Sequence, residues 1–135
     1  MKKLLLSFAV WLVLSACSTD TLNNHSDPTK AESKEHTTYE TIELADIPNF
    51  VEEGFIIADV REVDEFESGH IPGAINAPLS AIQNGDFSAL DPKEKYVIIC
   101  RSGNRSVTAS DLLSNEGFEI VNVREGMSSW TGKIE

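Results

Sequence analysis

Val97–Ser106 reads VIICRSGNRS, and these ten residues are the most informative part of the sequence. An apolar, β-branched strand ends on Cys100, and a short loop of small and cationic residues then opens a helix. Because open α/β sheets bind ligands outside the carboxyl ends of their strands, this order delivers Cys100 to a binding edge. Gly103 removes the steric bar to a loop whose backbone N–H groups turn toward one point. The stretch therefore predicts a nucleophilic thiolate at Cys100.

The positive groups around Cys100 are expected to stabilise that thiolate. An ordinary cysteine is only a few per cent thiolate at neutral pH. The helix that begins near Ser106 adds the positive end of its dipole, worth about 0.3–1 kcal/mol, and a neighbouring cation has a larger effect. We therefore expect Arg101 and Arg105, with the loop amides, to carry much of the stabilisation. No histidine adjoins Cys100 in the sequence, so its neighbours do not support a Cys–His dyad.

Strand and helix signals alternate on both sides of this stretch. Strands are expected at 39–42, 55–60, 74–76, 96–100 and 120–123, and helices at 44–52, 63–67, 80–87 and 105–116, with a closing turn at 127–130. The helix at 105–116 is expected to place Ala109, Leu112 and Leu113 inward. Apolar strands bounded by helices predict an α/β fold, a small, mainly parallel sheet covered by helices on both faces.

Three further segments stand in register with the cysteine loop: Phe55–Glu62 (FIIADVRE), Phe66–Pro78 (FESGHIPGAINAP) and Gly126–Trp130 (GMSSW). They are similar to the Asp-Val-Arg strand end, the Gly-His-Ile-Pro-Gly-Ala segment and the closing glycine-to-tryptophan helix of the rhodanese family of single-domain sulfurtransferases. The resemblance covers residues 39–132 and implies a rhodanese-like domain over 39–135. One departure is Glu125, which stands where many members have the first of two glycines.

The resemblance implies a thiosulfate sulfurtransferase that works by double displacement. The Cys100 thiolate attacks the outer sulfur of a donor such as thiosulfate, sulfite departs, and cyanide or a thiol acceptor then attacks the resulting persulfide. The implied substrate-binding residues are those of the loop: Arg101, Ser102, Gly103, Asn104 and Arg105. Asp59 and Arg61, at a neighbouring strand end, are expected either to order the loop or to form a purely structural pair. The reaction implies no metal and no organic cofactor.

Loop length separates two chemistries that this architecture hosts. Cysteine-dependent phosphatases use C-x-x-x-x-x-R, a cradle wide enough for phosphate, whereas Cys100 and Arg105 are spaced C-x-x-x-x-R. In rhodanese-like domains the shorter loop implies a tighter pocket for one sulfur atom, which disfavours a phosphatase. Two alternatives stay open: a sulfur carrier, sensor or binding module of the same fold without turnover, and a buried, inert cysteine at the end of a core strand.

The N-terminus is typical of an export signal. A short cationic start precedes the apolar run Leu4–Leu14, which is too short for a membrane span of about 20 residues. The run ends in Leu14–Cys17 (LSAC), which resembles a bacterial lipobox. We therefore expect a lipoprotein signal peptide at 1–16, lipidation of Cys17, and a membrane-anchored protein in the bacterial cell envelope, facing the periplasm or exterior. Cleavage one or two residues later, giving a soluble secreted form, is the alternative.

Composition limits the partners that the chain can take. Residues 17–38 are polar and predict a flexible tether between the lipid and the domain. The net charge of −11 disfavours nucleic-acid binding and repels anionic donors at long range. The chain has 2 cysteines; with Cys17 lipidated, Cys100 has no partner for an intrachain disulfide. The spacing of cysteines and histidines matches no zinc or iron site. We expect a monomeric domain.

Overall fold

A computed structural model of the protein describes residues 38–135. The predicted signal peptide at 1–16, the lipidation site at Cys17 and the tether at 17–38, apart from Thr38, lie outside this range. Within it, no helix combines the length and the apolar character that crossing a membrane requires. The fold below is therefore that of the predicted domain.

Five strands form one sheet in the order β1-β5-β4-β2-β3. Every pairing between neighbouring strands is parallel, which confirms the predicted sheet. The strand that Cys100 follows, β4, lies at the centre between β2 and β5. The strands span Glu40–Ile42 (β1), Phe55–Asp59 (β2), Ile75–Asn76 (β3), Lys95–Ile99 (β4) and Glu119–Val123 (β5).

The helices agree with the sequence prediction in position but less well in length. They are α1 (Ile47–Glu52), α2 (Val63–Glu67), α3 (Leu79–Gln83) and α4 (Asn104–Asn115), with 3₁₀ turns η1 (Leu44–Asp46) and η2 (Met127–Ser129). The prediction of a single helix at 44–52 is wrong, because this segment divides into η1 and α1. Pro48 lies in the first turn of α1, where a missing N–H is tolerated. The helix expected to reach residue 87 ends at Gln83, because Gly85 adopts a φ of 77°.

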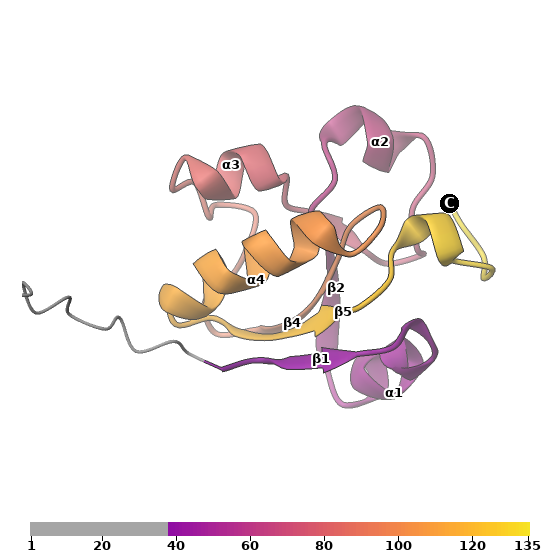
Figure 1. The fold of residues 1–135 in the computed structure, drawn as a ribbon, viewed down its shortest axis with the longest axis horizontal. Coiled ribbons are helices and arrows are strands. Elements are labelled where there is room, and N and C mark those ends of the chain that lie inside the picture. The colour runs from indigo at the N-terminus through magenta and orange to yellow at the C-terminus, as the bar shows by residue number, and fades with distance from the viewer. Residues whose placement is uncertain (1–37) are drawn as a thin grey trace, which may run out of the picture. The chain divides into compact units, whose positions relative to one another are not determined.

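Side chains of the central strand alternate between two hydrophobic cores. Tyr96, Ile98 and Cys100 face the core that α3 and α4 cover, together with Ala109 and Leu113 of α4. Val97 and Ile99 face the opposite core, with Ile47 of α1 and Met127 of η2. Figure 1 shows α3 and α4 on one side of the sheet and α1 on the other. Burial on both faces explains why Val97–Ile99 is continuously apolar rather than alternating.

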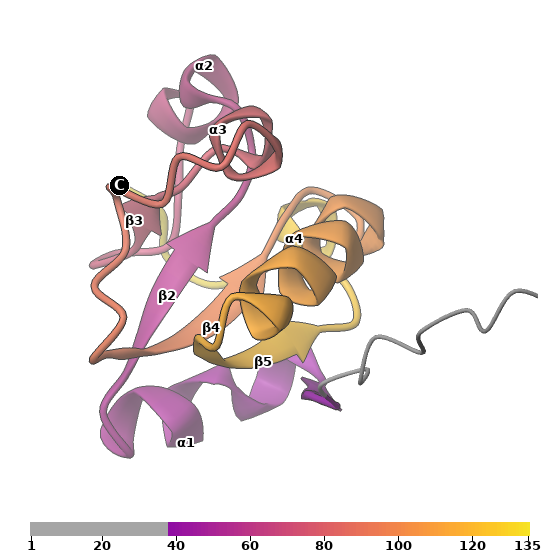
Figure 2. The same ribbon diagram turned by 90° about the vertical axis from the view of Figure 1, so that its left-hand side faces the viewer.

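The arginines of the chain lie near the carboxyl ends of the strands. All 4 arginines of the chain follow strands at this edge: Arg61 after β2, Arg101 and Arg105 after β4, and Arg124 after β5. Figure 2 shows β2 running toward α2, which begins at this edge. Because parallel strands bring their carboxyl ends together, residues distant in the sequence meet here.

Candidate active site

Cys100 lies at the end of β4, and its sulfur accepts a hydrogen bond from the Gly103 N–H at 3.2 Å. The residue is 1% exposed and belongs to the core beneath α4. Burial alone fits the alternative of an inert core cysteine. A backbone amide directed at the sulfur, at the N-terminus of a 12-residue helix, is instead the environment that stabilises a thiolate.

Gly103 is required at its position for two separate reasons. Its φ of 91° lies in the left-handed region, which side chains other than glycine's rarely adopt. A Cβ added there would lie 2.1 Å from the carbonyl oxygen of Arg124. Gly103 is also the N-cap of α4, and its carbonyl accepts a hydrogen bond from the Ser106 hydroxyl at 2.9 Å. The sharp turn that aims the amide at Cys100 therefore depends on this glycine.

A second glycine closes the loop from the C-terminal side. A Cβ on Gly126 would lie 2.3 Å from the carbonyl carbon of Arg101. This close approach lets the Met127 N–H donate to the Cys100 carbonyl at 2.8 Å and the Ser128 N–H to that of Arg101 at 3.0 Å. The preceding Glu125, the departure from the family pattern, accepts a hydrogen bond from the Leu44 N–H at 3.1 Å. The glycine that the loop needs is thus retained.

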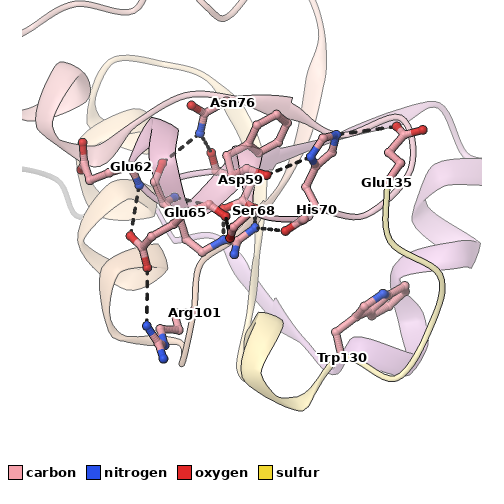
Figure 3. A network of polar contacts seen from close by, with 12 residues as sticks. Asp59, Glu62, Glu65, Ser68, His70, Asn76, Arg101, Trp130 and Glu135 are labelled. Carbon is pink, nitrogen blue, oxygen red and sulfur yellow. Dashed lines mark hydrogen bonds and ion pairs between the residues drawn. The ribbon is translucent and has the colours of Figure 1, made fainter.

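The two loop arginines are not equivalent. Arg105 forms a bidentate pair with Glu65 of α2, with Nη2 2.8 Å from Oε1 and Nη1 2.5 Å from Oε2. Arg101 Nη1 lies 4.0 Å from the same carboxylate, and its side chain is 71% exposed. Figure 3 shows Glu65 facing Arg101. The two arginines therefore differ in what they can offer a thiolate at Cys100, because Glu65 offsets the charge of Arg105.

Glu65 is the residue of the site that the sequence analysis missed. Its hydrogen bonds to Arg105 lower its pKa to about 2, so it is ionised at neutral pH. The same bonds raise the pKa of Arg105, with a smaller contribution from the charge of Cys100. Glu65 lies 40 residues before Arg105, so no local motif joins the two. The available signal was the acidic helix expected at 63–67, next to the edge that carries the arginines.

Asp59 and Arg61 form a buried pair with exposed side-chain fractions of 1% and 8%. Arg61 Nη2 lies 2.6 Å from Asp59 Oδ2, and the Arg61 backbone N–H also donates to Asp59 at 3.0 Å. The guanidinium then donates to the Gly69 carbonyl at 2.9 Å. These bonds anchor the segment after β2 rather than the loop after Cys100, so they favour the structural interpretation of the pair.

An open depression of about 270 Å³ adjoins the loop. Charged and hydroxyl side chains surround it together with one methionine: Arg61, Glu65, Ser68, Arg101, Met127 and Ser128. Of the predicted binding residues, only Arg101 borders it; Ser102 and Asn104 are exposed on the loop, Gly103 is buried, and Arg105 is half-buried beside α2. The depression is therefore a polar space beside the cysteine loop.

His70 contributes to the turn after α2. Its Nδ1–H donates to the Phe66 carbonyl at 3.0 Å, and the two rings stack with centroids 3.7 Å apart. Its Nε2 lies 3.7 Å from Oε1 of Glu135. Figure 3 shows the two side chains facing each other. Within residues 38–135, no group of three or more His, Cys, Asp or Glu side chains is arranged to hold a metal ion.

This fold and this cysteine loop match one family model, the rhodanese-like domain, over residues 40–133. The chain therefore belongs to the rhodanese family, whose members include sulfurtransferases and sulfur carriers. A rhodanese-related protein from Thermoplasma volcanium has the same fold, with a TM-score of 0.64 and 34% identity, covering 72% of this chain and 98% of that one.

Two Bacillus subtilis proteins illustrate the range of the family. The chain is 40% identical to "Putative sulfur carrier protein YrkF", over 62% of its own length and 45% of that protein. It is 39% identical to "Putative sulfurtransferase YtwF", over 62% of its own length and 81% of that protein. The chain thus spans less than half of the first relative and most of the second.

Proposed function

We propose that the protein is a sulfurtransferase that carries sulfane sulfur on Cys100. The observation that carries the proposal is the Gly103 N–H directed at the Cys100 sulfur at 3.2 Å. An amide so placed stabilises negative charge on sulfur in the thiolate and in the persulfide that replaces it. The names of two relatives, a sulfurtransferase and a "Putative thiosulfate sulfurtransferase, mitochondrial" from Schizosaccharomyces pombe (34% identical), support the same chemistry.

The reaction divides into two displacements at sulfur. The Cys100 thiolate attacks the outer sulfur of a donor such as thiosulfate, and the sulfur–sulfur bond of the donor breaks with its electron pair leaving on sulfite. An acceptor thiolate or cyanide then attacks the outer sulfur of the persulfide and releases the Cys100 thiolate. The loop Arg101–Arg105 surrounds the transferred sulfur in this proposal, and its amides and the Arg101 guanidinium offset the charge.

Intact mass spectrometry tests this cycle. The full-length chain, with Cys17→Ser so that Cys100 is the remaining cysteine, is reduced in detergent and treated with thiosulfate and then cyanide. We expect Cys100 to gain one sulfur atom that cyanide removes as thiocyanate, and the Cys100→Ser variant to gain none. A folded, reduced chain that gains no sulfur from any sulfane donor would overturn the proposal.

A second candidate function is that of a sulfur carrier without turnover, which the name of the first relative suggests. The same experiment separates the two functions. A persulfide that forms but persists in the presence of cyanide and small thiols supports a carrier that delivers sulfur to a protein acceptor. Steady release of thiocyanate supports the enzyme.

We also propose that the chain is exported and anchored by lipid at Cys17, because Leu14–Cys17 (LSAC) follows a short apolar run. Labelling bacterial cultures with a tagged palmitate analogue tests this proposal. We expect label on the wild-type chain in the membrane fraction and none on the Cys17→Ala variant. Equal labelling of both chains, or of neither, would contradict lipidation at this residue.

A further inference from the structure

Carboxylates pair with most of the arginines at the carboxyl edge of the sheet. Within residues 38–135, three of the four arginines have a carboxylate within hydrogen-bond distance: Arg61 pairs with Asp59, Arg105 with Glu65 and Arg124 with Glu43. Arg101 differs, because its Nη1 lies 4.0 Å from Oε1 of Glu65, a carboxylate that already accepts hydrogen bonds from Arg105. The edge therefore has many cations but little uncompensated positive charge.

Glu65 is the carboxylate that offsets the positive charge of Arg105, the second arginine of the cysteine loop. The Glu62 N–H donates to Oε2 of Glu65 at 3.3 Å. The position of the Glu65 carboxylate therefore does not depend on Arg105 alone. Both oxygens of Glu65 accept from Arg105, whose guanidinium an anionic donor group would otherwise bind. A donor anion must therefore compete with a carboxylate that is already fixed in the site.

Counting charges around the loop limits the donor. Arg105 and Glu65 cancel, and Asp59 and Arg61 cancel. The charge of Arg101 is then matched by the thiolate of Cys100. No full positive charge is left within this group for a donor carrying two negative charges, whereas a neutral or singly charged donor meets less repulsion.

We propose that Glu65 sets the donor class of the site: by holding Arg105, it favours organic sulfane donors of low charge, persulfides and thiosulfonates, over dianionic thiosulfate. This inference rests on the proposed sulfur transfer. With a thiosulfonate, the Cys100 thiolate bonds to the outer sulfur, the sulfur–sulfur bond of the donor breaks, and a sulfinate leaves with the electron pair. With an organic persulfide, the leaving group is a thiolate and the proton stays on the transferred sulfur.

Two donors that differ by one charge test the inference. We expect Glu65→Gln to raise the ratio of kcat/KM for thiosulfate to that for methanethiosulfonate about tenfold, mainly through KM, because one neighbouring charge is removed. Glu67→Gln is the matched control: it lies in the same α2, loses the same charge and makes no ion pair within residues 38–135. Its ratio should change by less than about twofold in physiological salt.

Alkylation of Cys100 gives the same comparison without sulfur transfer. Iodoacetate carries one negative charge more than iodoacetamide. The alkylation rate with iodoacetate divided by that with iodoacetamide therefore reports the local charge and not the reactivity of the thiol. We expect Glu65→Gln to raise this ratio about tenfold. Arg101→Gln should lower it by a similar factor, and the exposure of its side chain makes this variant the safer one for folding.

The outcomes separate the inference from the function on which it rests. If Cys100 takes sulfur from neither donor but the alkylation ratios shift as expected, the proposed function fails and the charge assignment of Glu65 stands. If both donors load Cys100 but neither ratio changes in Glu65→Gln and Arg101→Gln, the inference is overturned and the sulfurtransferase stands. Equal shifts in Glu65→Gln and Glu67→Gln would also overturn it, because net charge alone would then explain them.

Discussion

The Asp59–Arg61 and Glu65–Arg105 pairs have the same chemistry but different surroundings. Both join a carboxylate to a guanidinium by two or more hydrogen bonds. The first pair is almost completely buried, with side chains 1% and 8% exposed, whereas those of the second are 24% and 31% exposed. The comparison indicates that the buried pair Asp59–Arg61 stabilises the fold. The more exposed pair Glu65–Arg105 can instead affect the charge around the cysteine loop.

The largest effect should come from breaking the buried pair. Asp59→Ala leaves the Arg61 guanidinium buried without its carboxylate and should lower the free energy of unfolding by about 3–5 kcal/mol. Denaturant unfolding measures it. The double variant Asp59→Ala/Arg61→Ala should recover part of the loss, since no unpaired charge stays buried. A loss below about 1 kcal/mol for the single variant would refute the structural role of this pair.

A backbone change beside the exposed pair separates shape from charge at the site. Gly103→Ala meets both a left-handed backbone, at about 1–2 kcal/mol, and overpacking against the Arg124 carbonyl, at about 1–3 kcal/mol. We expect a loss of about 2–4 kcal/mol, measured by denaturant unfolding, and slower sulfur loading of Cys100. Gly54→Ala is the matched control, because Gly54 has the same φ of 91° but open space around its Cβ position. Equal losses in the two variants would show that the predicted clash is relieved.

The Glu65–Arg105 pair should make stability depend on acid. The folded-state pKa of Glu65, about 2, lies below its ordinary value of 4.5. The contribution of ionised Glu65 to the free energy of unfolding is therefore complete above about pH 4.5 and is lost as the pH falls toward 2. For a pair this exposed we expect about 1 kcal/mol. Unfolding of wild type and Glu65→Gln from pH 6 to the lowest pH at which both fold should show their stabilities converging; a constant difference would contradict the assignment.

The smallest effect should come from the most exposed pair. Arg124 Nε lies 2.7 Å from Glu43 Oε1, but the two side chains are 63% and 51% exposed. Arg124→Gln should change the free energy of unfolding by less than about 0.5 kcal/mol, because solvent screens the pair. Thermal unfolding at low and high salt checks this. A loss comparable to that of Asp59→Ala would break the proposed relation between burial and structural role.

The sequence predicted the sheet and the cysteine loop more reliably than the contacts that tune the loop. Continuous apolar runs such as Val97–Ile99 indicate strands buried on both faces, and the bounds predicted for α2, 63–67, are those observed. The partner of Arg105 was not predictable from local pattern, since Glu65 reaches it only when two strands end at the same edge. Pro48, which lacks a backbone N–H, favours the division of residues 44–52, and the Leu44 N–H donates to the Glu125 side chain, 81 residues away.

The clamp of Gly126–Ser128 on the cysteine loop has a consequence for how the protein is made. The Cys100 and Arg101 carbonyls are held by N–H groups of Met127 and Ser128, and β1 pairs with β5. A ribosome adds roughly 5–20 residues per second in order from the N-terminus, so the thiol emerges before the residues that shape its loop. Likewise, β1 cannot pair in the sheet until β5 has been synthesised. In each newly synthesised chain, the proposed nucleophile Cys100 is therefore present before the residues that shape its loop.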